Sequence, residues 1–197
     1  MDTFPIVAVA TSAGDLEPVG ELLSALPAEC GATLIVVQHF DSRRERVLSQ
    51  TLAERTILPV MHAHDGLVVE QDHVYLITAN ATLTVEGGCI RVTANASGLH
   101  HPGDVLFTSL AEERGGSAIV VVLSGEGSDG AVGVQAIRRA GGATLAQHPG
   151  SARFPSMPIC AIETRCVDFV LRPDEIAREL ARLSRRTAAP AGVRQAA

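Results

Sequence analysis

The sequence is poor in aromatic and basic residues. It has no tryptophan, and aromatic residues make up 3% of its 197 residues. Lysine and arginine together number 16 against 22 aspartates and glutamates, which gives a net charge of -6 at pH 7. Nucleic-acid binding depends on clustered positive charge and on rings that stack against bases. A role with nucleic acid as the main partner is therefore excluded.

Metal-ligand patterns are also missing. The cysteines show no C-x-x-C spacing, which favours reduced thiols over a zinc site or a disulfide framework. They are Cys30, Cys89, Cys160 and Cys166. Two histidine pairs have no acidic or cysteine partner nearby in the sequence, so we expect them at the surface and expect no metal. These pairs are His62 with His64 and His100 with His101.

Long apolar runs are lacking as well. No stretch approaches the length of a membrane span, and the N-terminus lacks the charged start and cleavage site of a signal peptide. We therefore expect a cytoplasmic protein without membrane insertion. Hydrophobic residues nevertheless make up 46% of the chain and charged residues only 19%, which indicates one compact, well-buried domain.

Alternating strand, turn and helix patterns run through the chain and predict an α/β fold with a mostly parallel sheet. The expected strands are 5–10, 32–37, 58–62, 118–123, 143–147 and 169–171. The expected helices are 16–26, 44–55, 105–114, 131–139, 159–164 and 173–184. Short strands within 73–93, around a Gly-Gly turn, predict a small antiparallel hairpin. We expect a catalytic domain at 1–184 and a flexible tail or linker at 185–197, which has no apolar periodicity.

The most chemically loaded stretch is 117–142. A buried strand leads into the turn Gly125-Glu126-Gly127-Ser128-Asp129-Gly130, and a helix follows. The turn matches G-x-G-x-x-G, which predicts a dinucleotide site as one alternative. However, that fingerprint needs an acidic residue about twenty positions further on, and the next strand ends without one. The acids within the turn would also repel phosphate, which disfavours a nucleotide.

Three residues of complementary chemistry follow three strands at their carboxyl ends: Ser12, His39 and Asp129. Ligands bind at this edge of such sheets. The three residue types are those of a nucleophile, its general base and the group that orients the base. Structural roles remain open from spacing alone, because Ser12 and Asp129 could cap helices and His39 could be a buried core histidine.

A resemblance to a known family adds to this pattern. The stretches VAVATSAGDLEPV, VVQHF, DHVYLITAN, DVLFTSLAEE, VVVLSGEGSDGAVG and FPSMPICAIE, in this order, resemble the catalytic domain of chemotaxis protein-glutamate methylesterases, CheB. The variant is most similar to the form fused to receptor methyltransferases. The resemblance implies a doubly wound sheet and a Ser12, His39 and Asp129 triad.

The same resemblance implies a chemistry. It implies hydrolysis of glutamate γ-methyl esters on chemoreceptor cytoplasmic helices, glutamine deamidation in some members, no cofactor, and a receptor methyltransferase domain as a further partner. By position in the two turns, we expect the backbone N–H groups of Ala13 and Glu126 to form the oxyanion site. The family usually has Gly where this chain has Asp15, and Met or Thr where this chain has Glu126. Both changes add negative charge, so a catalytically weakened binding or regulatory module is the alternative.

Overall fold

In the computed structural model, the described residues are 4–12, 16–38, 45–77, 81–94 and 101–188. A seven-stranded sheet forms the centre, and all of its strands are parallel, in the order β3-β4-β2-β1-β7-β8-β9. The strands are β1 (Ile6–Thr11), β2 (Thr33–Gln38), β3 (Val60–His62), β4 (Val74–Ile77), β7 (Ile119–Val122), β8 (Ala143–Gln147) and β9 (Phe169–Leu171).

The central strands are apolar on both faces, because both faces of the sheet are covered. Every residue of β1, β2 and β7 is buried. Side chains alternate along β1: Ile6 and Ala8 belong to one core cluster, and Val7 and Val9 belong to the other. Continuous apolar strands of this kind are typical of parallel sheets between two helical layers.

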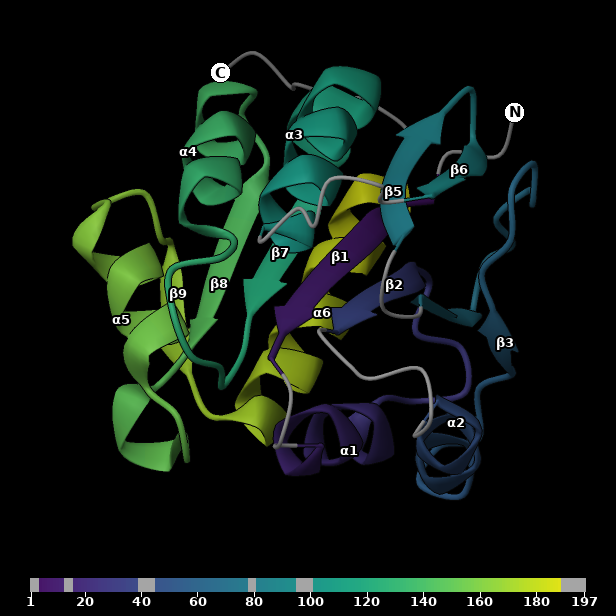
Figure 1. Cartoon of the computed structure of the whole chain (residues 1–197), viewed down its shortest axis with the longest axis horizontal. Helices are drawn as coiled ribbons and strands as arrows, with labels where there is room; N and C mark the ends of the chain where they lie inside the picture. The colour runs from purple at the N-terminus through teal and green to yellow at the C-terminus, as the bar shows by residue number, and fades with distance from the viewer. Residues whose placement is uncertain (1–3, 13–15, 39–44, 78–80, 95–100, 189–197) are drawn as a thin grey trace, which may run out of the picture.

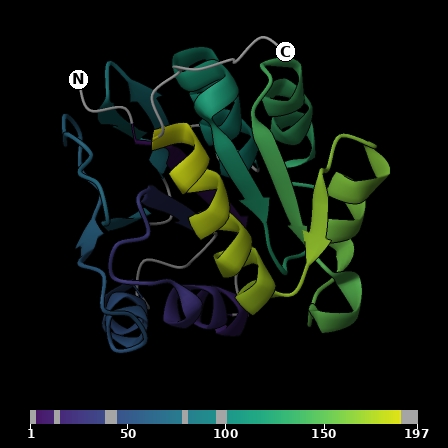
Figure 2. The same ribbon diagram turned by 180° about the vertical axis from the view of Figure 1, so that it is seen from behind.

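Helices cover each face, as Figure 1 and the reverse view in Figure 2 show. One face carries α1 (Glu17–Ala25), α2 (Glu45–Ala53) and α6 (Pro173–Ala188), and α6 crosses the sheet obliquely. The opposite face carries α3 (Pro102–Arg114), α4 (Ala131–Arg139) and α5 (Ser156–Glu163). The doubly wound α/β fold predicted from the sequence is therefore confirmed.

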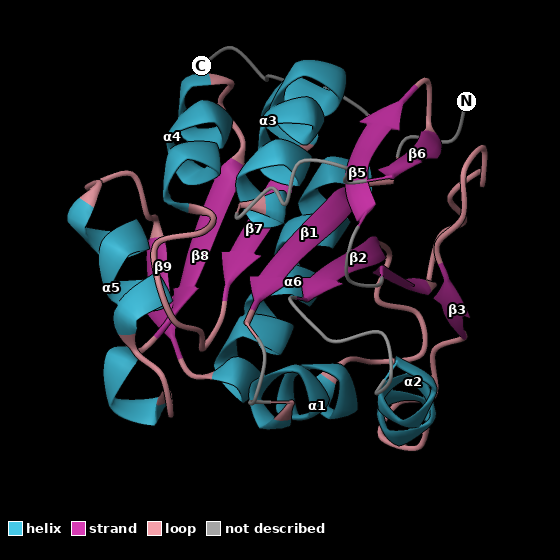
Figure 3. Cartoon of the chain, in the orientation of Figure 1, coloured by secondary structure: helices cyan, strands magenta, loops and turns pink. Residues whose placement is uncertain are grey.

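The hairpin expected within 73–93 is smaller than predicted. Strands β5 (Ala81–Glu86) and β6 (Cys89–Ala94) form a separate antiparallel sheet, visible beside α3 in Figure 3. The preceding strand β4 pairs in parallel with β2 and β3 instead. Its residues Val74 and Tyr75 are fully buried in the two opposite core clusters, which an edge hairpin could not provide.

Three predicted helix boundaries differ from the structure by three residues or more. Helix α3 begins at Pro102 and α5 at Ser156, each three residues before the predicted start. Helix α6 continues to Ala188, so residues 185–188 of the expected tail are helical, and 189–197 lie outside the described residues. Among the described residues, no helix has the length and apolar character needed to cross a membrane.

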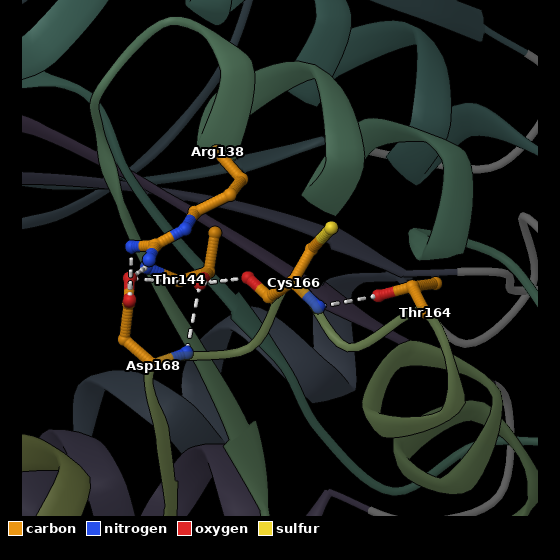
Figure 4. A network of polar contacts seen from close by, with 5 residues as sticks. All are labelled: Arg138, Thr144, Thr164, Cys166 and Asp168. Atoms are coloured by element: carbon orange, nitrogen blue, oxygen red, sulfur yellow. Dashed lines mark hydrogen bonds and ion pairs between the residues drawn. The ribbon is translucent and has the colours of Figure 1, made fainter.

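A polar network fastens the β8–β9 edge of the sheet to α4 (Figure 4). The Asp168 carboxylate accepts a hydrogen bond from the Thr144 N–H at 3.0 Å and pairs with Arg138. The Thr144 hydroxyl in turn donates to the Cys166 carbonyl at 2.6 Å. Because Thr144 is fully buried, this network satisfies polar groups that water cannot reach.

Candidate active site

The sheet reverses its winding direction between β1 and β7. Strand β1 pairs with β2 on one side and with β7 on the other. In open parallel sheets, the crevice beyond the carboxyl ends at such a point is where ligands bind. Ser12 follows β1 directly, and the glycine-rich turn 124–130 follows β7. The topology therefore brings these two predicted site segments to one place.

Direct hydrogen bonds join Ser12 to the turn. The Ser12 N–H donates to the Ser124 carbonyl at 3.3 Å, and the Thr11 hydroxyl donates to the same oxygen at 2.9 Å. Gly125 lies against the serine so closely that a Cβ there would be 2.7 Å from the Ser12 Cβ. Contact at this distance leaves no room for a side chain, which explains the glycine.

Asp129 lies at the end of the same turn and is 4% exposed. Its carboxylate accepts hydrogen bonds from the N–H groups of Gly103 and Asp104, each at 2.9 Å. Both N–H groups belong to the first turn of α3, whose dipole favours a carboxylate at that end. Asp129 therefore has a fixed orientation beside the β1–β7 crevice.

Asp104 and His101 surround Asp129, and the sequence analysis gave neither a role. The Asp104 carboxylate accepts from the Gly133 N–H at 2.8 Å, and partial burial, with a smaller contribution from the charge of Asp129, raises the pKa of Asp104. The Nδ1 atom of His101 lies 3.8 Å from Asp104 Oδ2 and 3.9 Å from Asp129 Oδ1.

These three side chains place possible ligand atoms within 4.8 Å of one another, the spacing of a cation site. However, both carboxylates already accept hydrogen bonds from backbone N–H groups. Hydrogen bonding thus accounts for the grouping of Asp104 and Asp129, and we assign no metal to it. The pattern His-Pro-Gly-Asp at 101–104 could have predicted the helix start, because proline is favoured in the first helical turn.

The segment 154–157 also supports the turn. The Gly125 N–H donates to the Phe154 carbonyl at 2.8 Å, while the Gly125 carbonyl accepts from the Met157 N–H at 3.0 Å. Both backbone groups of Gly125 thus face this segment, whereas the Ser124 carbonyl faces Ser12. In a trans peptide the N–H points opposite to the carbonyl. The Glu126 N–H therefore points away from the Met157 N–H, and it belongs to the turn that contacts Ser12.

These hydrogen bonds also bear on the dinucleotide alternative. A G-x-G-x-x-G turn binds pyrophosphate through a close approach of its backbone at a helix N-terminus. Here the Gly125 N–H bonds to Phe154 and the Gly127 N–H bonds to Ser156 Oγ at 3.1 Å. These two N–H donors already bind groups of the protein itself rather than facing a ligand, which further disfavours a nucleotide site.

The remaining predicted site residues, His39, Ala13 and Asp15, lie outside the described residues. Gln38, which precedes His39 in the chain, pairs in register with Thr11, which precedes Ser12. Glu126, the other expected oxyanion residue, is described and is exposed. Of the expected triad, the structure thus brings Ser12 and the Asp129 turn together.

Comparison with known proteins shows the family of the chain. A family model described as CheB methylesterase matches residues 7–180. The chain belongs to the CheB methylesterase family. The crystal structure of the Thermotoga maritima CheB methylesterase catalytic domain superposes with a TM-score of 0.83 at 25% sequence identity, covering 92% of this chain and 99% of that one.

Two of the sequence relatives are described as protein-glutamate methylesterases. A protein-glutamate methylesterase/protein-glutamine glutaminase from Anaeromyxobacter dehalogenans is 37% identical over 185 residues, covering 92% of this chain and 54% of the relative. A Bordetella parapertussis protein of the same description is 39% identical over 182 residues, covering 89% and 52%. The chain therefore spans about half the length of these CheB relatives. An uncharacterized 104.1 kDa protein of Rhodobacter capsulatus is 40% identical over 130 residues, or 14% of its length.

Proposed function

We propose that this chain is a serine hydrolase that removes methyl groups from glutamate γ-methyl esters on chemoreceptors. The observation that carries the proposal is the direct hydrogen bond between the backbone of Ser12 and the turn that ends in buried Asp129. Family membership supplies the substrate class, because the relatives' descriptions name protein-glutamate methylesterase and protein-glutamine glutaminase. Glutamine deamidation at the same site is part of the proposal.

The proposed mechanism divides ester hydrolysis into two steps. The Ser12 hydroxyl attacks the ester carbonyl while His39 takes its proton, and methanol then leaves with a proton from His39. Water, activated by His39, hydrolyses the acyl-enzyme and frees both the glutamate carboxylate and Ser12. Asp129 would orient His39 and stabilise its charged form. The buried position of Asp129 and its two N–H partners support that role.

The developing oxyanion would be held by the N–H groups of Ala13 and Glu126. The Glu126 N–H points away from the Met157 N–H and lies in the turn that contacts Ser12, which supports this assignment. The exposure of Glu126 also favours turnover over a catalytically weakened module, because a solvated carboxylate opposes the oxyanion less than a buried one.

The proposed partners are methylated cytoplasmic helices of chemoreceptors, which would place the reaction in the cytoplasm. A receptor methyltransferase domain is a further proposed partner, and the match to a small part of a 104.1 kDa protein is compatible with a fused arrangement.

The test is methanol release from a methylated receptor cytoplasmic fragment. We expect release by the chain and none by Ser12→Ala. Ser24→Ala, which changes an exposed serine on α1, is the matched control and should keep the activity. Equal release by the Ser12 variant would overturn the nucleophile, and no release by the unchanged, folded chain from several receptors would favour a binding module.

A further inference from the structure

One hydroxyl at the start of α5 contacts the backbone on both sides of Glu126. Ser156 Oγ donates a hydrogen bond to the Gly125 carbonyl at 3.0 Å and accepts one from the Gly127 N–H at 3.1 Å. The Met157 N–H adds a second donor to the same carbonyl at 3.0 Å. The peptide that ends in the Glu126 N–H is thus held at its carbonyl, and the next peptide is held at its N–H.

These hydrogen bonds matter because the backbone around Glu126 has few other restraints on its torsion angles. Glycine flanks Glu126 on both sides, and glycine allows the widest range of backbone torsions. Gly127 adopts φ of 87°, and a Cβ placed on it would meet no atom within 4 Å, so packing does not restrain it. Rotation of the Gly125–Glu126 peptide would change the direction of the Glu126 N–H, the proposed oxyanion donor. Hydrogen bonds from Ser156 and Met157 oppose that rotation.

We propose that Ser156 is a positioning residue that keeps the Glu126 N–H directed at the oxyanion. The proposal rests on the proposed esterase function and adds to it a residue from a third segment of the chain. Ser156 does not itself reach the reacting atoms in this proposal; it acts through the turn. Preorganised donors stabilise charge that develops in the transition state, so a loosened donor lowers kcat and leaves substrate binding nearly unchanged.

The kinetic test compares Ser156→Ala with Ser109→Ala. Ser109 is a matched control, because its hydroxyl also donates to a backbone carbonyl, of Leu106 at 2.9 Å, and accepts a backbone N–H, of Val85 at 3.2 Å. Loss of a whole oxyanion donor costs about 10²- to 10³-fold in kcat, so we expect a loosened one to cost about tenfold with KM unchanged. Ser156→Thr keeps the hydroxyl and should recover most of the rate.

Several outcomes would overturn the proposal. Equal kcat for the two alanine variants would do so, and so would a threonine variant as slow as alanine. A wild-type chain that releases no methanol is a different failure, because it removes the esterase function itself. A second measurement therefore does not depend on activity. Amide hydrogen exchange at Gly127 should accelerate in Ser156→Ala and stay unchanged in Ser109→Ala, and unchanged exchange in both would show that Ser156 does not hold the turn.

Discussion

Asp104 and Asp129 are joined by a reciprocal pair of helix-terminus contacts. The Asp104 N–H donates to the Asp129 carboxylate, and the Asp104 carboxylate accepts the N–H of Gly133, in the first turn of the helix that follows Asp129. Each aspartate thus binds the N-terminal turn of the other's helix. The turn that carries Asp129 cannot shift without breaking both contacts, so α3 and α4 fix the position of this carboxylate together.

The first prediction concerns the pH dependence of stability. Burial and the neighbouring Asp129 raise the pKa of Asp104, so the folded protein binds this proton more tightly than the unfolded chain does. The resulting stabilisation is present below the ordinary pKa of an aspartate and is lost as the pH rises through the raised value. Asp104→Asn keeps an oxygen for the Gly133 N–H and removes the charge. We therefore expect it to gain stability relative to wild type as the pH rises.

Thermal unfolding at several values between about pH 4 and about pH 7 measures this difference. His101 also faces the pair, so the comparison is repeated in a His101→Gln background. A difference between Asp104→Asn and its parent that stays constant over the whole range would contradict the raised pKa.

The second prediction separates activity from stability at Asp129. In Asp129→Asn one amide oxygen can still accept an N–H, but the amide NH₂ must face the other N–H donor, from Gly103 or Asp104. We expect a loss of about 1–3 kcal/mol in unfolding free energy for the unmatched donor. Methanol release should fall by about 10³-fold or more, because the base loses its orienting carboxylate.

Asp168→Asn is the control for that experiment. Asp168 also accepts a backbone N–H, from Thr144, but lies in the network between β8, β9 and α4 (Figure 4). The Asp168→Asn variant should lose stability but keep the wild-type rate of methanol release per folded molecule. Equal rates for the two asparagine variants would show that Asp129 has a structural role alone.

Most strands of the parallel sheet could be predicted from the sequence, and the candidate site could be assigned to their carboxyl ends, because both inferences depend on local patterns. Uninterrupted apolar runs such as 118–123 identify buried parallel strands, and the carboxyl end of each run is then known. The fixed geometry of parallel sheets places Ser12 and the turn before Asp129 side by side without knowledge of any side chain.

Contacts between segments distant in the chain could not be predicted from the sequence. The starts of α3 and α5 were placed three residues late, and those first turns carry the N–H groups and the hydroxyl that hold the site. Gly103 donates to Asp129, 26 residues away, and Ser156 contacts Gly125, 31 residues away. Helix-start signals such as Pro102 locate a terminus, but the partner of that terminus is set by packing.

The third prediction tests the close approach at Gly125. A Cβ there would lie 2.1 Å from the Met157 sulfur and 3.0 Å from the Ser12 nitrogen, so Gly125→Ala must displace backbone at the serine. We expect a loss of stability of about 1–3 kcal/mol from overpacking and a fall in methanol release larger than that loss explains.

Gly116→Ala is the matched control for this change. Its added Cβ would lie 3.6 Å from the nearest atom, an ordinary contact, far from Ser12 in the fold. The rate should stay at the wild-type value. If Gly125→Ala keeps both stability and rate, the approach of the turn to Ser12 is looser than these distances state.

The last prediction addresses the negative charge of Glu126. Its N–H is the proposed oxyanion donor, but the residue is exposed, and water screens a charge at the surface strongly. We therefore expect Glu126→Met to change kcat by less than about twofold, with Glu163→Met at the exposed end of α5 as the control. Methanol release at low and high salt measures it. A large rise in kcat for Glu126→Met that shrinks with salt would mean that the carboxylate opposes the oxyanion after all, and the charge would then be a real restraint on turnover.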